Sequence, residues 1–333
     1  MNYIGSKHKL SAFIVETVKA VVGANLTGKV FCDLFAGTGI VGRNFKPLVK
    51  KVIANDSEFY SFVLNQNYIG NHREIAEKSA FLAELEALTS ADDGFIYQNY
   101  CAGSGSGRQY FSDDNGKKID AARRQIEAWK TANRINDSLY YFLLASLLEA
   151  ADKVANTASV YGAFLKKLKP TAQKPLTLAP AQFLLNNDND HEVFNADAND
   201  LITQIRGDIL YLDPPYNQRQ YGANYHLLNT IARYQPFTPQ GKTGLPPDYA
   251  RSNYCRKNRV AIAFERLIKR ADFPFVFVSY NNEGLMTVAE IKTLMEKYGK
   301  YRVVSTAYQR FKADNGRAYS AAATEEYLHI LEK

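Results

Sequence analysis

The segment Asp213-Pro214-Pro215-Tyr216 directly follows a hydrophobic run, Ile209 to Leu212, and combines a carboxylate, two prolines and an aromatic ring. Proline lacks an N–H donor and has a fixed φ, so a central strand cannot continue through this pair. We therefore expect a buried strand to end at Leu212 and a rigid turn to follow it. Ligands of open α/β sheets bind outside the carboxyl ends of the strands, which makes this turn a candidate site.

The groups in this turn are suited to binding an amine. The carboxylate of Asp213 and the backbone carbonyl of Pro214 are two acceptors that the N–H bonds of one amino group could reach. The prolines would hold both acceptors rigidly, and Tyr216 offers a ring face on which a planar group can stack. A proline turn in which Asp213 only caps the backbone is the alternative structural interpretation.

A second motif is rich in glycine. Gly37-Thr-Gly39-Ile-Val-Gly42 matches G-x-G-x-x-G, and Asp56 lies near the spacing of an acid that binds a ribose. The glycines would allow a tight turn and a close approach of the backbone to a ligand. The motif alone suits any cofactor that contains adenosine, including a nicotinamide dinucleotide, and such turns are also used purely structurally.

The elements that must position these motifs can be read from hydrophobic patterning. Short β-rich runs at 29–33, 51–55, 208–212 and 274–279 alternate with helical stretches, which predicts a doubly wound parallel sheet. Runs at 301–306 and 326–331 predict two closing strands, an antiparallel hairpin at one edge, joined by a loop around Asn315-Gly316. Residues 71–189 break the alternation and predict a mostly helical inserted subdomain, so that residues 1–70 and 190–333 form the other domain.

The charge distribution suggests a polyanionic partner. The chain has 333 residues and a net charge of +7. The segment from Asn217 to Arg259 has seven basic residues and one acid, with tyrosines between them. Cations interleaved with aromatic rings are typical of nucleic-acid binding, although a solvated basic surface explains the charge equally well. The tyrosines are Tyr221, Tyr225, Tyr234, Tyr249 and Tyr254.

Several classes of protein are not indicated by the sequence. There is no apolar run of 18 residues and no signal-peptide pattern at the N-terminus, so we expect no membrane span. Cys32, Cys101 and Cys255 have no spacing typical of a metal site or a disulfide framework, and the histidines show no paired spacing. We therefore expect no metal, a reducing cytoplasmic environment and a chain that acts as a monomer.

Taken in order along the chain, the motifs resemble those of one enzyme family. Asn2-Tyr-Ile-Gly-Ser-Lys7 comes first, then Asp33-Leu-Phe-Ala-Gly-Thr-Gly39, the helical insertion, and Asp213 to Tyr216. This order resembles the Dam-like, alpha-class (D12 type) DNA adenine-N6 methyltransferases. The resemblance implies a Rossmann-like sheet that binds S-adenosylmethionine, and a target-recognition insertion at residues 71–189.

The resemblance also implies roles for individual residues. Tyr3 and Lys7 would hold the methionine end of the cofactor, with Lys7 near its carboxylate, and Asp33 would accept from its amino group. Asp56 would bind the ribose hydroxyls and Asp197 the adenine. The full cofactor set that we predict is Tyr3, Lys7, Asp33, Phe35, Gly37, Gly39, Asp56 and Asp197.

The predicted catalytic residues are Asp213, Pro214, Pro215 and Tyr216. The lone pair of an adenine amine is delocalised into the ring, and two acceptors can favour a pyramidal nitrogen that attacks a methyl group in line. The base must first leave the duplex and could then stack on Tyr216.

Double-stranded DNA is the predicted substrate. Arg123, Arg124, Lys117 and Lys118 could add phosphate contacts from the insertion, unless the insertion is a purely structural cap. A cognate restriction endonuclease that acts separately is a possible partner, and a solitary methylase is the other option. The residues assigned to DNA are Arg108, Arg219, Tyr221, Arg251, Arg256, Lys257 and Arg259.

Three rival functions explain part of the sequence. An RNA adenine or guanine amino-methyltransferase can share the tetrapeptide at Asp213, although the large insertion before it favours DNA. A nicotinamide-dependent oxidoreductase would explain the glycine-rich loop but not the turn at Asp213. A non-catalytic DNA-binding protein on the same fold would not need Lys7, Asp33, Asp56 and Asp213 together.

Overall fold

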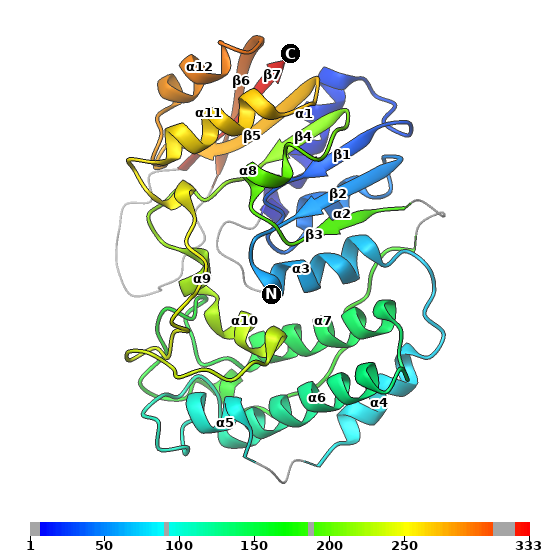
Figure 1. The fold of residues 1–333 in the computed structure, drawn as a ribbon, viewed down its shortest axis with the longest axis vertical. Coiled ribbons are helices and arrows are strands. Elements are labelled where there is room, and N and C mark those ends of the chain that lie inside the picture. The colour runs from blue at the N-terminus through cyan, green and yellow to red at the C-terminus, as the bar shows by residue number, and fades with distance from the viewer. Residues whose placement is uncertain (1–6, 90–92, 186–189, 309–323) are drawn as a thin grey trace. The chain divides into compact units, whose positions relative to one another are not determined.

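The computed structural model describes residues 7–89, 93–185, 190–308 and 324–333, and the chain divides into two compact units (Figure 1). The sheet unit comprises the described residues of Gly5–Asn65, Asn186–Tyr221 and Arg251–Lys333. The helical unit comprises Gln66–Leu185 and Gly222–Ala250.

The sheet unit is built on seven strands in the order β3-β2-β1-β4-β5-β7-β6. The first five are parallel, and β7 runs antiparallel to both β5 and β6. The doubly wound sheet and the antiparallel pair at one edge are therefore confirmed. The strands are β1 (Val30–Asp33), β2 (Lys51–Asn55), β3 (Glu192–Phe194), β4 (Ile209–Leu212), β5 (Phe275–Asn281), β6 (Lys300–Tyr308) and β7 (Thr324–Glu332).

Strand β3 was not predicted, and the predicted loop at Asn315-Gly316 lies outside the described residues. β3 has only three residues, all exposed or half-buried, so it lacks the hydrophobic run that marks the other parallel strands. In contrast, β4 is buried at all four positions. A buried parallel strand can be predicted from its run of apolar residues. A short edge strand such as β3 has no such run and is recognised only by its pairing with the neighbouring strand.

Helices cover both faces of the sheet. Cys32, Leu210 and Val276 form a core with three helices, α8 (Ala198–Leu201), α11 (Val260–Arg270) and α12 (Val288–Met295). The neighbouring residue Phe31 points to the opposite face, where Phe45 of α2 (Ile40–Phe45) stacks on it at 3.9 Å between ring centroids. The other helices of this unit are a 3-10 helix (Lys7–Leu10), α1 (Ser11–Val22), α3 (Phe59–Asn65) and a 3-10 turn (Asn253–Cys255).

The helical unit is organised around α7 (Asp137–Val154), which buries a nearly continuous apolar surface. It packs against α6 (Asp113–Thr131), whose Trp129 is buried. Ser112 and Asn136 begin these two helices by accepting from backbone N–H groups of the first turn. The remaining elements are a π-helix (Gln66–Gly70), α4 (Lys78–Ala87), α5 (Phe95–Tyr100), a 3-10 helix (Pro170–Gln173) and α10 (His226–Arg233), and α9 (Tyr221–Asn224) leads into α10.

The longer segment of the observed helical unit begins at Gln66 and ends at Leu185, a few residues from the predicted bounds of 71 and 189, and the main difference from the predicted division lies at residues 222–250. Residues 222–250 were assigned with the catalytic domain, but they pack in the helical unit. Arg123 of α6 donates to the carbonyls of Ile231 and Ala232 in α10, and Tyr234 donates to Asp120. α10 is short and strongly amphipathic, so its apolar face needs a partner, and α6 and α7 supply it.

Candidate active site

The predicted catalytic turn lies at the carboxyl end of β4, in the sheet unit. Asp213 has a side chain that is 17% exposed, and its Oδ1 lies 3.2 Å from the Nζ of Lys7. Burial and the charge of Glu326 raise the pKa of Asp213 to about 6, while Lys7 acts in the opposite direction. Asp213 is thus a partly desolvated carboxylate with an open side, which is suited to accept a hydrogen bond from a ligand.

Lys7 joins Asp213 to a second carboxylate that the sequence did not suggest. Its Nζ lies 2.6 Å from Oε1 of Glu326 in β7, and the hydroxyl of Ser279 in β5 donates to the same oxygen at 2.9 Å. Burial alone would lower the pKa of Lys7, but Asp213 and Glu326 hold it well above its usual value. Lys7 therefore remains an ammonium within this cluster.

The ring of Tyr216 is held from the strand next to it. The backbone carbonyl of Tyr216 accepts from Leu285 N–H at 2.9 Å. The ring meets Tyr280 of β5 edge to face, with centroids 6.1 Å apart. A Cβ at Gly284 would lie 2.1 Å from the Tyr280 ring, so only glycine leaves room for this arrangement. Tyr280 and Gly284 thereby fix the position of the predicted stacking platform.

The glycine-rich loop connects β1 to α2 and is held by Asp33 and Asp56. Gly42 N–H donates to Oδ2 of Asp33 at 3.0 Å, and Gly37 N–H donates to Oδ2 of Asp56 at 2.8 Å. Gly39 has a φ of +76°, and a Cβ there would meet the Asn65 side chain at 2.5 Å. The loop therefore requires glycine at this position and is bound to the carboxylates at the ends of β1 and β2.

Asp33 has an unused acceptor. Among the described residues no donor reaches its Oδ1, although the side chain is buried. Burial, opposed by the Gly42 hydrogen bond, raises the pKa of Asp33 to about 8. A buried acceptor without a partner is costly, and a cationic ligand group would satisfy it. The methionine ammonium of the predicted cofactor fits this requirement.

A cavity of about 560 Å³ lies beside Asp197 in the sheet unit. Asp197 begins α8 by accepting from Asn199 N–H, and Asn199 is bonded in turn to the hydroxyl of Tyr254. Tyr254 also meets Phe35 edge to face at 5.0 Å. The predicted adenine-binding acid therefore borders a hollow large enough for a heterocycle. Its other lining residues include Asp200, Asn253, Asn258, Arg259, Ile262, Ala263 and Arg266.

Asn55 holds two parts of the predicted cofactor site in place, although no motif in the sequence singles it out. This buried side chain at the end of β2 donates to the carbonyls of Leu34 and Ala196 and accepts from Ala196 N–H. Those residues directly precede Phe35 and Asp197. Its position at the end of a predicted strand, directly before Asp56, could have indicated this role. A buried amide there can bond to the backbone that follows the neighbouring strands on either side.

Most of the predicted cofactor and catalytic residues fall within the sheet unit, at the carboxyl ends of β1, β2, β3 and β4. Tyr3 lies outside the described residues. Lys7 was expected near the cofactor carboxylate, but here its ammonium contacts Asp213 and Glu326. Pro214 is buried, and Pro215 is half-buried. No motif marks Glu326, because the closing hairpin was identified only by its hydrophobic pattern.

The residues assigned to DNA differ in their surroundings. Arg219, Arg251, Arg256, Lys257 and Arg259 are exposed on the sheet unit, and Tyr221 is half-buried. Arg108 belongs to the helical unit and donates to the carbonyls of Asn99 and Gly241. These contacts are structural, so any role of Arg108 in DNA binding stays a prediction.

Two expectations about nucleic-acid contacts were wrong. Tyr225 and Tyr254 were considered as surface aromatics, but they are 1% and 4% exposed and belong to the two cores. Arg123 was considered as a phosphate contact, but it is buried and bonded to α10. Aromatic and cationic residues look the same in a sequence whether they face solvent or a packed neighbour.

Two absences apply to the part of the chain that the structure describes. Within residues 7–89, 93–185, 190–308 and 324–333, no cluster of His, Cys, Asp or Glu side chains could hold a metal ion. Over the same residues, no helix has the length and hydrophobicity that a membrane crossing requires.

Comparison with known proteins agrees with the geometry. Residues 3–311 match the model of the D12 class N6 adenine-specific DNA methyltransferases. Type II methyltransferase M.NlaIII of Neisseria lactamica is 62% identical, over 100% of this chain and 99% of that protein. M.CviAII of Paramecium bursaria Chlorella virus 1 is 39% identical, over 99% and 98%. M.FokI of Planomicrobium okeanokoites is 37% identical over the whole chain, which spans 53% of that longer protein.

These similarities cover the catalytic turn, the glycine-rich loop and the insertion together. S-adenosylmethionine is the methyl donor of this family. With the carboxylates of β1, β2 and β4 gathered at one edge of the sheet, the chain belongs to the D12 class of N6 adenine-specific DNA methyltransferases, and it is an adenine-specific DNA methyltransferase.

Proposed function

We propose that this enzyme methylates the N6 of an adenine that has left the DNA duplex, with Asp213 and the carbonyl of Pro214 accepting the two N–H bonds of its amine. The observation that carries the proposal is the position of Asp213. It ends β4 in the same unit as Asp33 and Asp56, and its carboxylate is restrained by Lys7 but still 17% exposed.

The bound S-adenosylmethionine supplies an electrophilic methyl group on a sulfonium. Asp33 would hold the ammonium of its methionine end through the unused Oδ1, and Asp56 would bind its ribose. Both carboxylates are fixed by backbone N–H groups, so they need little rearrangement when the ligand enters. Asp197 and the cavity beside it would receive the adenine ring.

Asp213 and Pro214 would then orient the target amine. Acceptance of two hydrogen bonds favours a pyramidal nitrogen whose lone pair points away from the acceptors. As the N–C bond forms, the C–S bond to the methyl group breaks and S-adenosylhomocysteine leaves, so positive charge develops on the nitrogen. The preorganised carboxylate of Asp213 would stabilise that charge and accept the N–H proton that the methylated nitrogen then releases. Tyr216 would stack on the extruded base, since its ring is already held by Tyr280.

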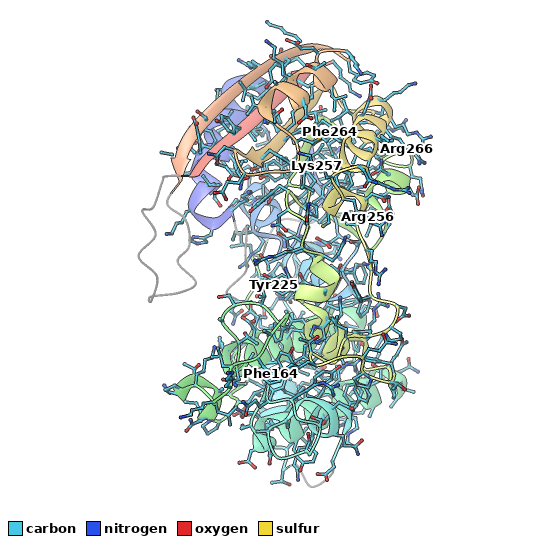
Figure 2. The ribbon with its side chains drawn as sticks, turned by 90° about the vertical axis from the view of Figure 1, so that its left-hand side faces the viewer. Phe164, Tyr225, Arg256, Lys257, Phe264 and Arg266 are labelled. Carbon is cyan, nitrogen blue, oxygen red and sulfur yellow. The ribbon has the colours of Figure 1, made fainter. Side chains whose placement is uncertain are left out.

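Phosphate contacts would come from an exposed basic surface of the sheet unit, which we define as Arg251, Arg256, Lys257 and Arg259 with Arg266 of α11. Arg256 and Lys257 precede α11, and Arg266 lies on the helix itself (Figure 2). Arg259, Ile262 and Arg266 follow the spacing of one helical face, and all three are exposed. Cations on exposed side chains can neutralise DNA phosphates.

The names of the relatives support a proposal about the biological setting. Several are named as type II methyltransferases or modification methylases, among them M.NlaIII. We propose that this enzyme protects DNA within a restriction–modification system whose endonuclease acts as a separate protein. Family membership favours DNA over the RNA substrate that the sequence motifs alone left open.

The experiment that tests this function is methyl transfer from labelled S-adenosylmethionine to unmethylated duplex DNA, with RNA in parallel and nucleoside analysis of the product. We expect N6-methyladenine in DNA only. Label in RNA alone would contradict the proposed substrate. A duplex with 2-aminopurine at the mapped target position should brighten on binding if the base leaves the stack, and unchanged fluorescence would count against extrusion.

A further inference from the structure

Three charged side chains from distant parts of the chain meet below the catalytic turn. Lys7 comes from the first 3-10 helix, Asp213 from the end of β4, and Glu326 from β7. The Lys7 and Glu326 side chains are 4% and 6% exposed. Two carboxylates and one ammonium leave this cluster with one net negative charge in a poorly solvated place.

The sign of that charge matters for the reaction. Lys7 contacts Asp213, so the pair Lys7–Asp213 by itself would be neutral. A neutral pair would give little stabilisation to the positive charge that moves from the sulfonium to the target nitrogen. Electrostatic effects are large where water is excluded, so a second carboxylate at this place changes the potential at the amine.

Glu326 is held so that it can act in this way. β7 pairs antiparallel with β5, with Glu326 opposite Asn281, and Ser279 lies two residues along β5. Alternate residues of a strand share a face, which puts Ser279 and Glu326 on the same side of the sheet. The Ser279 hydroxyl donates to Oε1 of Glu326, the oxygen that Lys7 contacts. The carboxylate is therefore fixed in both position and direction.

We propose that Glu326 is a positioning residue for methyl transfer: it holds Lys7 against Asp213 and supplies the negative charge that Lys7 would otherwise cancel. Lys7 can then fix the Asp213 rotamer without neutralising the site. The inference rests on the proposed function, in which Asp213 accepts the target amine, and it assigns to the closing hairpin a part in the chemistry.

The decisive variant is Glu326→Gln, which removes the charge and keeps the shape. The matched control is Glu325→Gln, because Glu325 neighbours it on β7 but bonds to Ser305 and Tyr327 instead. We expect the single-turnover methyl-transfer rate to fall about 30-fold in Glu326→Gln and less than twofold in Glu325→Gln. The affinity for S-adenosylmethionine, measured by calorimetry, should stay within about threefold in both variants.

The pH dependence separates this role from a purely structural one. Asp213 is faced by Lys7, Glu326, Tyr211 of β4 and Asp33 of β1, and the charge of Glu326 raises the pKa of Asp213. Removing that charge should move the acidic limb of the single-turnover rate profile to lower pH. A loss of rate with no shift of this limb would mean that Glu326 only supports the fold, and would overturn the inference.

Two further variants keep the test decisive if Glu326→Gln does not fold. Glu326→Asp retains the charge and should keep the acidic limb in place with a rate loss below about tenfold. Ser279→Ala frees the carboxylate and should lower the rate about fivefold with the limb unmoved. Unchanged rates in Glu326→Gln, or in both of these variants, would overturn the proposal.

Asp213→Asn, measured in the same assay, distinguishes failure of the proposed function from failure of the proposed role of Glu326. If Asp213→Asn retains the wild-type rate, the proposed function itself fails. If Asp213→Asn is inactive but Glu326→Gln is as fast as wild type, only the role of Glu326 fails.

Discussion

Two sets of buried ionisable side chains, one in each unit, differ in how fully they are hydrogen-bonded. In the helical unit, Arg123 donates to two backbone carbonyls and to the side chains of Glu127 and Tyr140. Asp120 accepts from two backbone N–H groups and from the hydroxyl of Tyr234. In the sheet unit, Asp33 has an oxygen that no described residue reaches. The bonds of Arg123 and Asp120 are used within the fold, whereas the free oxygen of Asp33 can accept a hydrogen bond from a ligand.

The largest effect outside the catalytic turn should come from Asp33→Asn. Replacing a buried carboxylate by an amide removes its attraction for the cofactor ammonium, and a hydrogen bond of this kind contributes about 3 kcal/mol. We expect the affinity for S-adenosylmethionine, measured by calorimetry at pH 8, to fall about 100-fold. A loss below threefold would mean that the unused oxygen of Asp33 is not a ligand site.

The pH dependence of cofactor binding also tests whether Asp33 binds the cofactor ammonium. The pKa of Asp33 is about 8 without cofactor, so this group is mostly protonated below that pH. Binding must release the proton before the carboxylate can accept from an ammonium, so affinity should rise as pH increases from about 6 to 8. In Asp33→Asn this part of the rise should disappear, and an identical pH profile would contradict the assignment.

The free protein should show the opposite trend in stability. A carboxyl group whose folded pKa is raised binds a proton on folding between its unfolded pKa, near 4, and its folded pKa, near 8. The contribution of Asp33 to the free energy of unfolding therefore decreases as pH rises through this window. Urea unfolding of the cofactor-free wild type and of Asp33→Asn should diverge with pH, and parallel curves would argue against a raised pKa.

Arg123→Ala tests whether the fully hydrogen-bonded arginine of the helical unit stabilises the fold. Its guanidinium bonds to the end of α10 would be lost, and we expect the free energy of unfolding to fall by about 2 kcal/mol, measured by urea denaturation. Arg124→Ala is the matched control, because that side chain is exposed and adjacent on α6, and it should cost less than about 0.5 kcal/mol. Equal losses in the two variants would remove the distinction between saturated and exposed arginines.

The smallest effect should be seen at the exposed basic surface. Arg256→Ala with Lys257→Ala should weaken DNA binding about tenfold near 0.1 M salt and reduce the slope of log affinity against log salt by about two. The control is Lys269→Ala with Arg270→Ala, which removes the same charge from the far end of α11. A slope that changes equally in both pairs would indicate net charge alone and exclude a defined contact at Arg256 and Lys257.

Much of the sheet was predictable because its strands carry their own signal. β1, β2, β4 and β5 are apolar runs flanked by helices, and the turn at Asp213 marks where β4 ends. β3 was missed because three half-buried or exposed residues have no such pattern. The packing of residues 222–250 in the helical unit was also not predicted, because the sequence does not show which helices the apolar face of α10 packs against.

The candidate site was predictable only where chemistry and sequence motif coincide. Asp56 and Asp213 could be singled out from their places next to apolar runs, whereas Asp33 and Asp197 were assigned only through the resemblance to the methyltransferase family. Glu326 and Ser279 are separated from Lys7 by most of the chain, and only the register of β7 against β5 brings them together. Which arginines are available to DNA could not be predicted, because the sequence does not show burial. Arg123 is buried and Arg256 is exposed, although both are arginines in basic segments.

The most direct test of the central claim is the single-turnover rate of methyl transfer to duplex DNA by Asp213→Asn, with cofactor and DNA both saturating. We expect a rate at least about 1,000-fold below wild type, because an amide cannot supply the charge at the target amine. Affinity for S-adenosylmethionine should remain within about threefold of wild type. A rate within tenfold of wild type would show that the carboxylate at the end of β4 does not carry the reaction.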